Sequence, residues 1–180
     1  MNKKINLTVF CSSKQNLASE YYLETAKTIE LLDINKYSIV YGGGTIGIMG
    51  TVRETWIKNS GQIISSNIKK FAESSIIDDY LYDKIVDRQK KMVELGDGYL
   101  VFPGGYGTHY EMLEVITSND IGETTKPIFV LNINGIFDNF VNQINLLIKE
   151  GFITKDFVKL NIFVESDPYN LVKIINTYNW

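Results

Sequence analysis

Hydrophobic residues in this chain gather in short runs that are separated by longer amphipathic stretches. The runs Ile5–Phe10, Tyr37–Tyr41 and Tyr99–Phe102 are rich in β-branched and aromatic residues. Near-continuous apolar runs of this length are typical of parallel strands that are buried on both faces of a sheet. We predict further short strands at Gln62–Ser65, Ile128–Leu131 and Asn161–Val164.

The stretches between these runs repeat apolar residues at helical spacing. The segment Leu17–Leu32 carries apolar side chains every three or four positions, which predicts a helix with one buried face. A helix at Lys84–Leu95 is expected to bury Ile85 and Met92 and to leave Arg88 on its polar face. The other helices are predicted at Ile46–Lys58, Thr108–Ile121, Phe137–Lys149 and Tyr169–Ile175.

Alternating strands and helices indicate the fold class. Such alternation predicts βαβ units and a mostly parallel sheet with helices on both faces. We therefore expect a Rossmann-like, doubly wound α/β fold in a single nucleotide-binding domain over residues 1–180, a length that suits one hydrophobic core. The segment Asn67–Asp83 fits neither pattern, and we expect a loop or a flexible lid there.

Composition and charge limit the kinds of partner and site that the protein can have. Hydrophobic residues make up 44% of the chain, and the net charge is −3 with the basic residues spread along it, so no nucleic-acid partner is expected. The single cysteine, Cys11, allows no internal disulfide, and with the single histidine, His109, it makes no zinc site. No run approaches the roughly 20 apolar residues of a membrane span, and no signal peptide is recognisable. We expect a cytoplasmic protein with no membrane partner.

Three of the predicted strands end in turns of small residues. The turns are Cys11–Ser13, Gly42–Thr45 and Pro103–Thr108. Glycine lets a backbone approach a ligand closely, and each turn leads toward a helix whose free N–H groups attract an anion. Ligands of open parallel sheets bind beyond the carboxyl ends of the strands, where all three turns should meet. One glycine turn is weak evidence, but two of them and a serine turn on the same edge favour a phosphate site.

The second turn matches a dinucleotide motif in form. Gly42–Gly47 fits G-x-G-x-x-G, but a dinucleotide site also needs an acid about twenty residues later for the ribose hydroxyls. The stretch Ile63–Asn67 carries no acid, and the turn follows the second strand rather than the first. This disfavours a nicotinamide oxidoreductase. A P-loop lysine pattern is also absent from the sequence, which disfavours nucleoside triphosphate hydrolysis.

Two charged residues near the third turn each allow two interpretations. Thr108 and Glu111 have the spacing of a capping box, in which they would serve only the helix end. Alternatively, Glu111 is a carboxylate held beside a phosphate cradle. Arg88 is either a solvated surface charge or a fixed guanidinium that faces a ligand. His109 and Cys11 are assigned no catalytic role, and Cys11 is expected to be a small buried residue.

The turns carry a family resemblance that covers nearly the whole chain. Val9–Ser13, Tyr41–Gly50 and Pro103–Glu111 resemble the LOG (Lonely Guy) family of cytokinin riboside 5′-monophosphate phosphoribohydrolases, and the last segment is a complete P-G-G-x-G-T-x-x-E signature. The resemblance implies hydrolysis of a purine nucleoside 5′-monophosphate, AMP or an N6-substituted AMP, to the free base and ribose 5-phosphate. It also implies a homodimer and no metal or organic cofactor.

The resemblance implies a role for each matching residue. Glu111 would be the catalytic carboxylate and Arg88 the catalytic arginine. The 5′-phosphate would be held by Gly104, Gly105, Gly107 and Thr108. Further substrate contacts are expected from the first two turns, at Ser12, Gly43, Gly44, Thr45 and Met49.

Some segments depart from the family pattern. The family's M-H-x-R-K is Ile85–Gln89 in this chain, so the arginine stays and the lysine becomes Gln89. The family's T-W-x-Q is here Thr117–Asp120. Both departures concern the base-recognition side rather than the phosphate loop. A nucleotide or cofactor carrier of the same fold, without turnover, is the alternative function, and such a carrier could do without Arg88 or Glu111.

Overall fold

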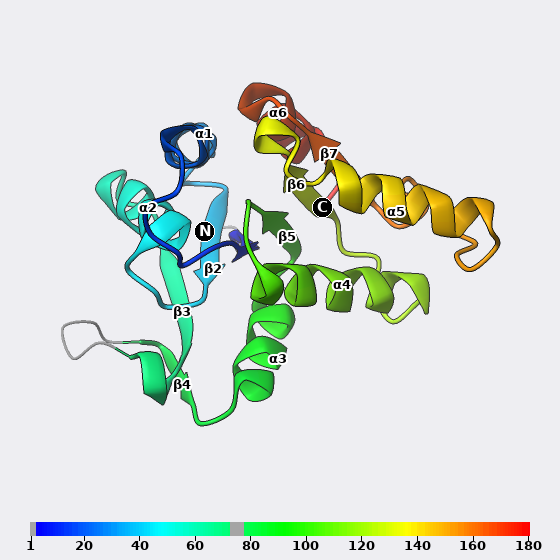
Figure 1. Ribbon diagram of the computed structural model, residues 1–180. Helices are drawn as coiled ribbons and strands as arrows, with labels where there is room; N and C mark the ends of the chain where they lie inside the picture. The colour runs from blue at the N-terminus through cyan, green and yellow to red at the C-terminus, as the bar shows by residue number, and fades with distance from the viewer. Residues whose placement is uncertain (1–2, 73–77) are drawn as a thin grey trace.

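The computed structural model describes residues 3–72 and 78–180, and it contains a seven-stranded sheet (Figure 1). The strands lie in the order β4-β3-β2-β1-β5-β6-β7, and each pair of neighbours is parallel. The chain therefore winds outward from β1 to one edge and then, starting again at β5, to the other. The strands are β1 Ile5–Phe10, β2 Tyr37–Tyr41, β3 Ile63–Ile68, β4 Tyr80–Tyr82, β5 Gly98–Val101, β6 Ile128–Leu131 and β7 Ile162–Glu165.

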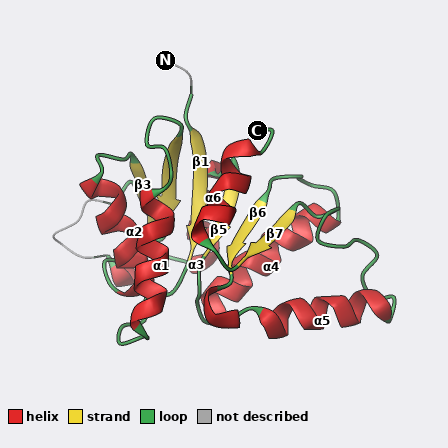
Figure 2. Ribbon diagram, turned by 90° about the horizontal axis from the view of Figure 1, so that it is seen from above, coloured by secondary structure: helices red, strands yellow, loops and turns green. Residues whose placement is uncertain are grey.

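Helices cover both faces of this sheet (Figure 2). Neighbouring strand residues point to opposite faces, so Val9 belongs to one apolar cluster with Trp56 and Leu171, whereas Phe10 belongs to another with Met92 and Met112. Two apolar cores result, one on each face, and the predicted doubly wound α/β fold is confirmed. The helices are α1 Ser19–Glu30, α2 Gly47–Lys58, α3 Ile85–Leu95, α4 Tyr106–Asp120, α5 Asp138–Lys149 and α6 Pro168–Thr177, with short 3₁₀ turns at Lys69–Phe71 and Ile133–Gly135.

The segment between β3 and α3 differs from the prediction. Strand β3 continues to Ile68 because Ser66, Asn67 and Ile68 pair with the short strand β4. The expectation of a loop over Asn67–Asp83 was therefore wrong at Asn67 and Ile68, which belong to β3, and at Tyr80–Tyr82, which form β4. Residues 73–77 lie outside the described part of the chain. Among the described residues, no helix is long and apolar enough to cross a membrane.

The predicted faces of α3 also need correction. Ile85 is 51% exposed, although helical spacing placed it in the core, whereas Arg88 and Gln89 are 8% and 1% exposed. Met92 is buried as expected. Both side chains have partners on other elements: Arg88 bonds to Glu111 of α4 and to the Ser66 carbonyl of β3, and Gln89 Nε2 donates to Glu114 of α4. The Gln89 Oε1 atom is buried without a hydrogen-bond partner among the described residues.

Candidate active site

The turns after β1, β2 and β5 meet at the carboxyl edge of the sheet. Ser12 connects them, because its N–H donates to the Pro103 carbonyl at 3.1 Å and its carbonyl accepts from the Met49 N–H at 3.0 Å. The turns after β1 and β5 flank the point where the winding direction reverses, which is where doubly wound sheets bind ligands. The structure thus brings the three predicted turns to one place.

The third turn leads into α4 without a capping side chain. The helix begins at Tyr106, and no described side chain hydrogen-bonds to cap it at Gly105. Gly104 must be glycine, since a Cβ there would overlap the Thr108 side chain. No described atom lies within 4 Å of where a Cβ on Gly105 or Gly107 would be. The start of α4 therefore has no side-chain cap, and free N–H groups at such a helix start favour an anion.

A buried ion pair joins α3 to α4 behind this turn. Arg88 Nη1 lies 2.8 Å from Glu111 Oε1, and the two side chains are 10% and 9% exposed. Arg88 Nε also donates to the Ser66 carbonyl at 3.0 Å, and the Ser66 hydroxyl donates to the Arg88 carbonyl at 3.2 Å. A Cβ on Gly42 would overlap the guanidinium, so the second turn packs directly against it. Arg88 is a fixed guanidinium, and the solvated interpretation was wrong.

Glu111 does not serve as a helix cap. Because α4 begins at Tyr106, Thr108 and Glu111 are its third and sixth residues rather than the N-cap and its partner. The capping-box interpretation was wrong because the glycine turn enters the helix earlier than Thr108. Burial raises the pKa of Glu111, while the charge and the hydrogen bond of Arg88 lower it and the Glu114 carboxylate raises it further, so that the net shift is upward.

Cys11 and His109 lie near the site, but their surroundings support no chemical role for either residue. Burial raises the pKa of the Cys11 thiol, and the nearby Glu111 carboxylate adds to the shift, so the thiol stays protonated and unreactive. His109 shares a hydrogen bond of 3.0 Å between Nδ1 and the Gly105 carbonyl, and its ring packs against Phe137 and Phe140. It fixes the start of α4 against the residues around α5.

The second turn contributes backbone rather than charge. Gly43 has a φ of +80°, which favours glycine, and the Gly44 N–H points to the Met49 sulfur at 3.2 Å. Thr45 follows in the same turn, with its carbonyl packed against Gly50. The predicted binding residues of the first two turns thus lie together at the sheet edge beside the ion pair.

Sequence reasoning missed an acidic pair at the end of β3. Asp78 accepts a hydrogen bond from Asn67 Nδ2 at 3.1 Å, and Asp79 accepts one from the Ser65 N–H at 2.7 Å. A Cβ on Gly43 would lie 2.6 Å from Asp78 Oδ1, so this carboxylate lies over the second turn. The carboxylates reach the end of β3 from the start of β4, eleven or more residues further along. The search for an acid directly after the third strand could not find them.

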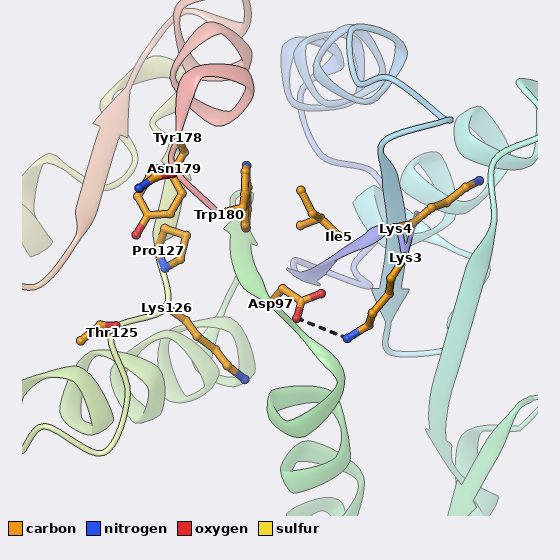
Figure 3. A pocket seen from close by; sticks show the side chains of 10 residues that line it. All are labelled: Lys3, Lys4, Ile5, Asp97, Thr125, Lys126, Pro127, Tyr178, Asn179 and Trp180. Carbon is orange, nitrogen blue, oxygen red and sulfur yellow. Dashed lines mark ion pairs between the residues drawn. The ribbon is translucent and has the colours of Figure 1, made fainter. Parts of the chain in front are cut away.

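A separate pocket of about 500 Å³ lies at the opposite edge of the sheet (Figure 3). The Trp180 ring stands between Ile5 and Pro127, and the missing side chain of Gly98 makes room for it. At the rim, Lys3 pairs with Asp97 at 3.9 Å. None of the predicted site residues lines this pocket, since it is formed before β1, β5 and β6 rather than after them.

The site at the carboxyl edge combines a candidate anion cradle, the uncapped start of α4, with a buried charged pair. Within the described ranges, no three His, Cys, Asp or Glu side chains come together in a way that could hold a metal ion. The cradle faces open space, and the carboxylate and the guanidinium lie one helical turn behind it. Fold and site define a Rossmann-like α/β protein with a candidate ligand site where the winding of its sheet changes direction.

Comparison with known proteins gives the family. A family model described as possible lysine decarboxylase matches residues 41–175, and the chain belongs to this family. It is similar to the cytokinin riboside 5′-monophosphate phosphoribohydrolase LOG2 of Arabidopsis thaliana, with 27% identity over 96% of this chain and 83% of that protein. It is also similar to the probable cytokinin riboside 5′-monophosphate phosphoribohydrolase LOGL3 of Oryza sativa subsp. japonica, with 31% identity over 81% of this chain and 72% of that protein.

A solved structure shares the fold. The molybdenum cofactor carrier protein of Chlamydomonas reinhardtii superposes with a TM-score of 0.70 over 97% of both chains, at 14% sequence identity. At that identity the likeness concerns the arrangement of strands and helices alone.

Proposed function

We propose that the protein hydrolyses the N-glycosidic bond of a purine nucleoside 5′-monophosphate, AMP or an N6-substituted AMP, to the free base and ribose 5-phosphate. The buried Arg88–Glu111 pair at the glycine-rich start of α4 carries the proposal. Its support is that the curated relatives of the chain are named phosphoribohydrolases.

The start of α4 suits the 5′-phosphate. Its first N–H groups and the positive end of its dipole favour a dianion, and Thr108 can add a hydroxyl donor. Glu111 lies three residues further along the helix, a rise of about 4.5 Å. A nucleotide held by its phosphate at this turn therefore brings its sugar toward the carboxylate.

In the proposed reaction, the bond between C1′ and the base nitrogen breaks, and its electron pair leaves with the base. The sugar acquires oxocarbenium character, which the Glu111 carboxylate stabilises while it orients a water molecule. The water oxygen bonds to C1′, and the protons of the water end on the new hydroxyl and on the base. Arg88 favours the ionised form of Glu111, because its charge opposes the rise in pKa that burial causes.

The homodimer is also a proposal. Tyr106, Tyr110 and Leu113 follow each other at helical spacing on α4 and are exposed, and Ile85 and Val86 are exposed at the start of α3. Helices α3 and α4 are joined by the ion pair, so this apolar surface, the α3–α4 face, adjoins the site. We propose that two copies of the chain pack through the α3–α4 face, since apolar side chains exposed on two neighbouring helices favour association.

A second candidate function is a carrier that binds a nucleotide or cofactor without turnover. The shared fold of the molybdenum cofactor carrier protein favours it. A carrier would use the glycine turn, but it has no need of a buried carboxylate held by a guanidinium. Retention of both residues therefore favours the hydrolase.

The test is incubation with AMP, GMP, IMP and isopentenyl-AMP, followed by chromatography for the free base. Adenosine is the matched control, because it keeps the glycosidic bond and lacks the phosphate that the start of α4 would bind. We expect base release from at least one nucleotide and little from adenosine. AMP binding without base release from any nucleotide would replace the hydrolase with the carrier.

A further inference from the structure

Helices α3 and α4, which lie next to each other in Figure 1, are joined by two side-chain pairs in succession. Arg88 binds Glu111, and the next residue, Gln89, donates from Nε2 to the Glu114 carboxylate. Gln89 is 1% exposed and Glu114 is half-buried. The two acids are three positions apart on α4 and therefore lie on the same side of it.

The two pairs differ in charge. Arg88 neutralises Glu111, whereas the Gln89 amide offers Glu114 a hydrogen bond and no positive charge. The four side chains thus carry one positive and two negative charges, a net charge of −1. A charge that is held in a buried, low-dielectric contact acts on its neighbours more strongly than one in water.

The charged groups that act on Glu111 come from two elements. Arg88 approaches from α3 and Glu114 from α4 itself, and the Cys11 thiol, at the end of β1, stays protonated. Glu114 also acts on Tyr99 of β5, whose pKa is raised by burial and then by this carboxylate. Glu114 therefore lies on the side of α4 that faces Gln89 of α3.

We propose that Gln89 and Glu114 are positioning residues that set the charge of the site. Gln89 holds the Glu114 carboxylate in place without neutralising it, so the full negative charge of Glu114 acts on Glu111. Glu111 then takes up a proton at a higher pH than the Arg88 pair alone would allow. The inference rests on the proposed function, in which ionised Glu111 is the active form. As the pH is lowered, base release by the wild type is expected to fall at a higher pH than base release by a variant in which Glu114 is neutral.

The test uses Glu114→Gln, which removes the charge and keeps a hydrogen-bond acceptor, and Gln89→Lys, which restores the basic residue of the family segment. The first readout is the titration of the Glu111 carboxyl in the free protein, followed by ¹³C NMR and assigned with Glu111→Gln. The second is the pH profile of kcat/KM for base release. In both variants we expect the titration midpoint and the acid limb to fall by about 0.5 to 1 pH unit, the scale of one nearby charge.

Glu94→Gln is the matched control, because it removes the same charge from an exposed position of α3 that pairs with Lys91. Its Glu111 midpoint is expected to stay at the wild-type value. An unmoved midpoint in Glu114→Gln overturns the proposal, even if the variant unfolds at a lower temperature, because a structural role alone would produce that result. A midpoint that moves in Glu114→Gln but not in Gln89→Lys removes the role of Gln89. If the wild type releases no base, the proposed function fails, and the NMR titration still tests this inference.

Discussion

Arg88 contacts three separate parts of the site. It binds the Glu111 carboxylate on α4 and the Ser66 carbonyl on β3, and its guanidinium packs over the backbone of Gly42. A planar fork with several donors can make these contacts together, which a lysine ammonium cannot. Burial makes the pair interdependent, since removal of either charge leaves the other uncompensated in a dry environment.

The first prediction concerns Arg88→Ala and pH. Burial already raises the pKa of Glu111 above its unfolded value, and loss of Arg88 removes the effect that opposes the rise. A carboxyl with a raised pKa stabilises the fold while it is protonated and loses that contribution as the pH rises through the raised pKa. The loss of unfolding free energy should therefore be greater at pH 8, at about 3–5 kcal/mol, than at pH 5.

Urea unfolding at the two pH values measures this difference. Lys91→Ala is the control, because it removes a cation of the same helix whose ion pair with Glu94 is exposed, and it should change stability little at either pH. An equal loss at pH 5 and pH 8 in Arg88→Ala would mean that Glu111 does not depend on Arg88 for its charge.

The second prediction concerns Gly42→Ala. The backbone of Gly42 is not in the left-handed region, so alanine causes no backbone strain, but its Cβ would overlap the guanidinium. Arg88 is then displaced from Glu111, and a shift of about 1 Å at a reacting group can cost 10²-fold in rate. We expect kcat for base release to fall on that scale while circular dichroism shows the fold unchanged. A wild-type kcat would show that the position of the guanidinium is unimportant.

At the scale of elements, the hydrophobic pattern predicted the strands that lie deep in the sheet. Strands such as β2 and β6 consist almost entirely of apolar residues that are buried on both faces, so composition alone marks them. Strand β4 has three residues, and it forms because it pairs with the end of β3, a long-range contact that no local pattern encodes. For the same reason the buried face of α3 was misjudged, since the partners of Arg88 and Gln89 are on another helix.

The candidate site was predictable to the extent that it depends on turns. Glycine turns after parallel strands must meet at one edge, so the position of the cradle followed from Gly42–Thr45 and Pro103–Thr108. The pairing of Arg88 with Glu111 did not follow, because helical spacing cannot tell which polar side chain is buried against another element. Asp78 and Asp79 arrive at the site from a segment whose fold no pattern predicted.

The third prediction tests α4 as the phosphate-binding element. Thr108→Val removes one hydroxyl donor at the helix start and nearly keeps the side-chain volume. A hydrogen bond to a charged group contributes about 1.5–3 kcal/mol, so the Kd for AMP should rise by about 10-fold or more. Calorimetry in the Glu111→Gln background, where turnover is stopped, measures it.

Thr117→Val is the matched control on the same helix, since its hydroxyl donates to the Leu113 carbonyl far from the turn. It should leave the Kd for AMP unchanged. Equal affinities of Thr108→Val and the wild type would show that Thr108 does not bind the phosphate.

At the scale of the whole molecule, the topology explains why one edge of the sheet carries the candidate site. The chain leaves β1 in one direction and returns to β5 on its other side, and the edge beyond the carboxyl ends of such a pair of strands is where doubly wound sheets bind ligands. The opposite edge is closed in part by Trp180, which packs against Gly98 and the Phe129 ring. The two edges of one sheet therefore differ in what they can bind.

The fourth prediction concerns association. Wild-type protein at micromolar concentration should scatter light as a dimer, and Leu113→Lys, which places a charge on the exposed α3–α4 face, should shift it to the monomer. Leu146→Lys is the control, because Leu146 is similarly exposed but lies on α5. A monomeric wild type, or dissociation by Leu146→Lys alone, would rule out the α3–α4 face as the contact.

The most direct test of the central claim is the rate of base release from the best nucleotide by Glu111→Gln. Glutamine keeps the size of the side chain and can still accept a hydrogen bond from Arg88, but it has no negative charge to stabilise an oxocarbenium ion. We expect the rate of base release to fall by at least about 100-fold, the usual scale for loss of one acid–base group, while calorimetry still detects AMP binding. Base release at the wild-type rate would contradict it, because the carboxylate would then serve only to hold Arg88 in place.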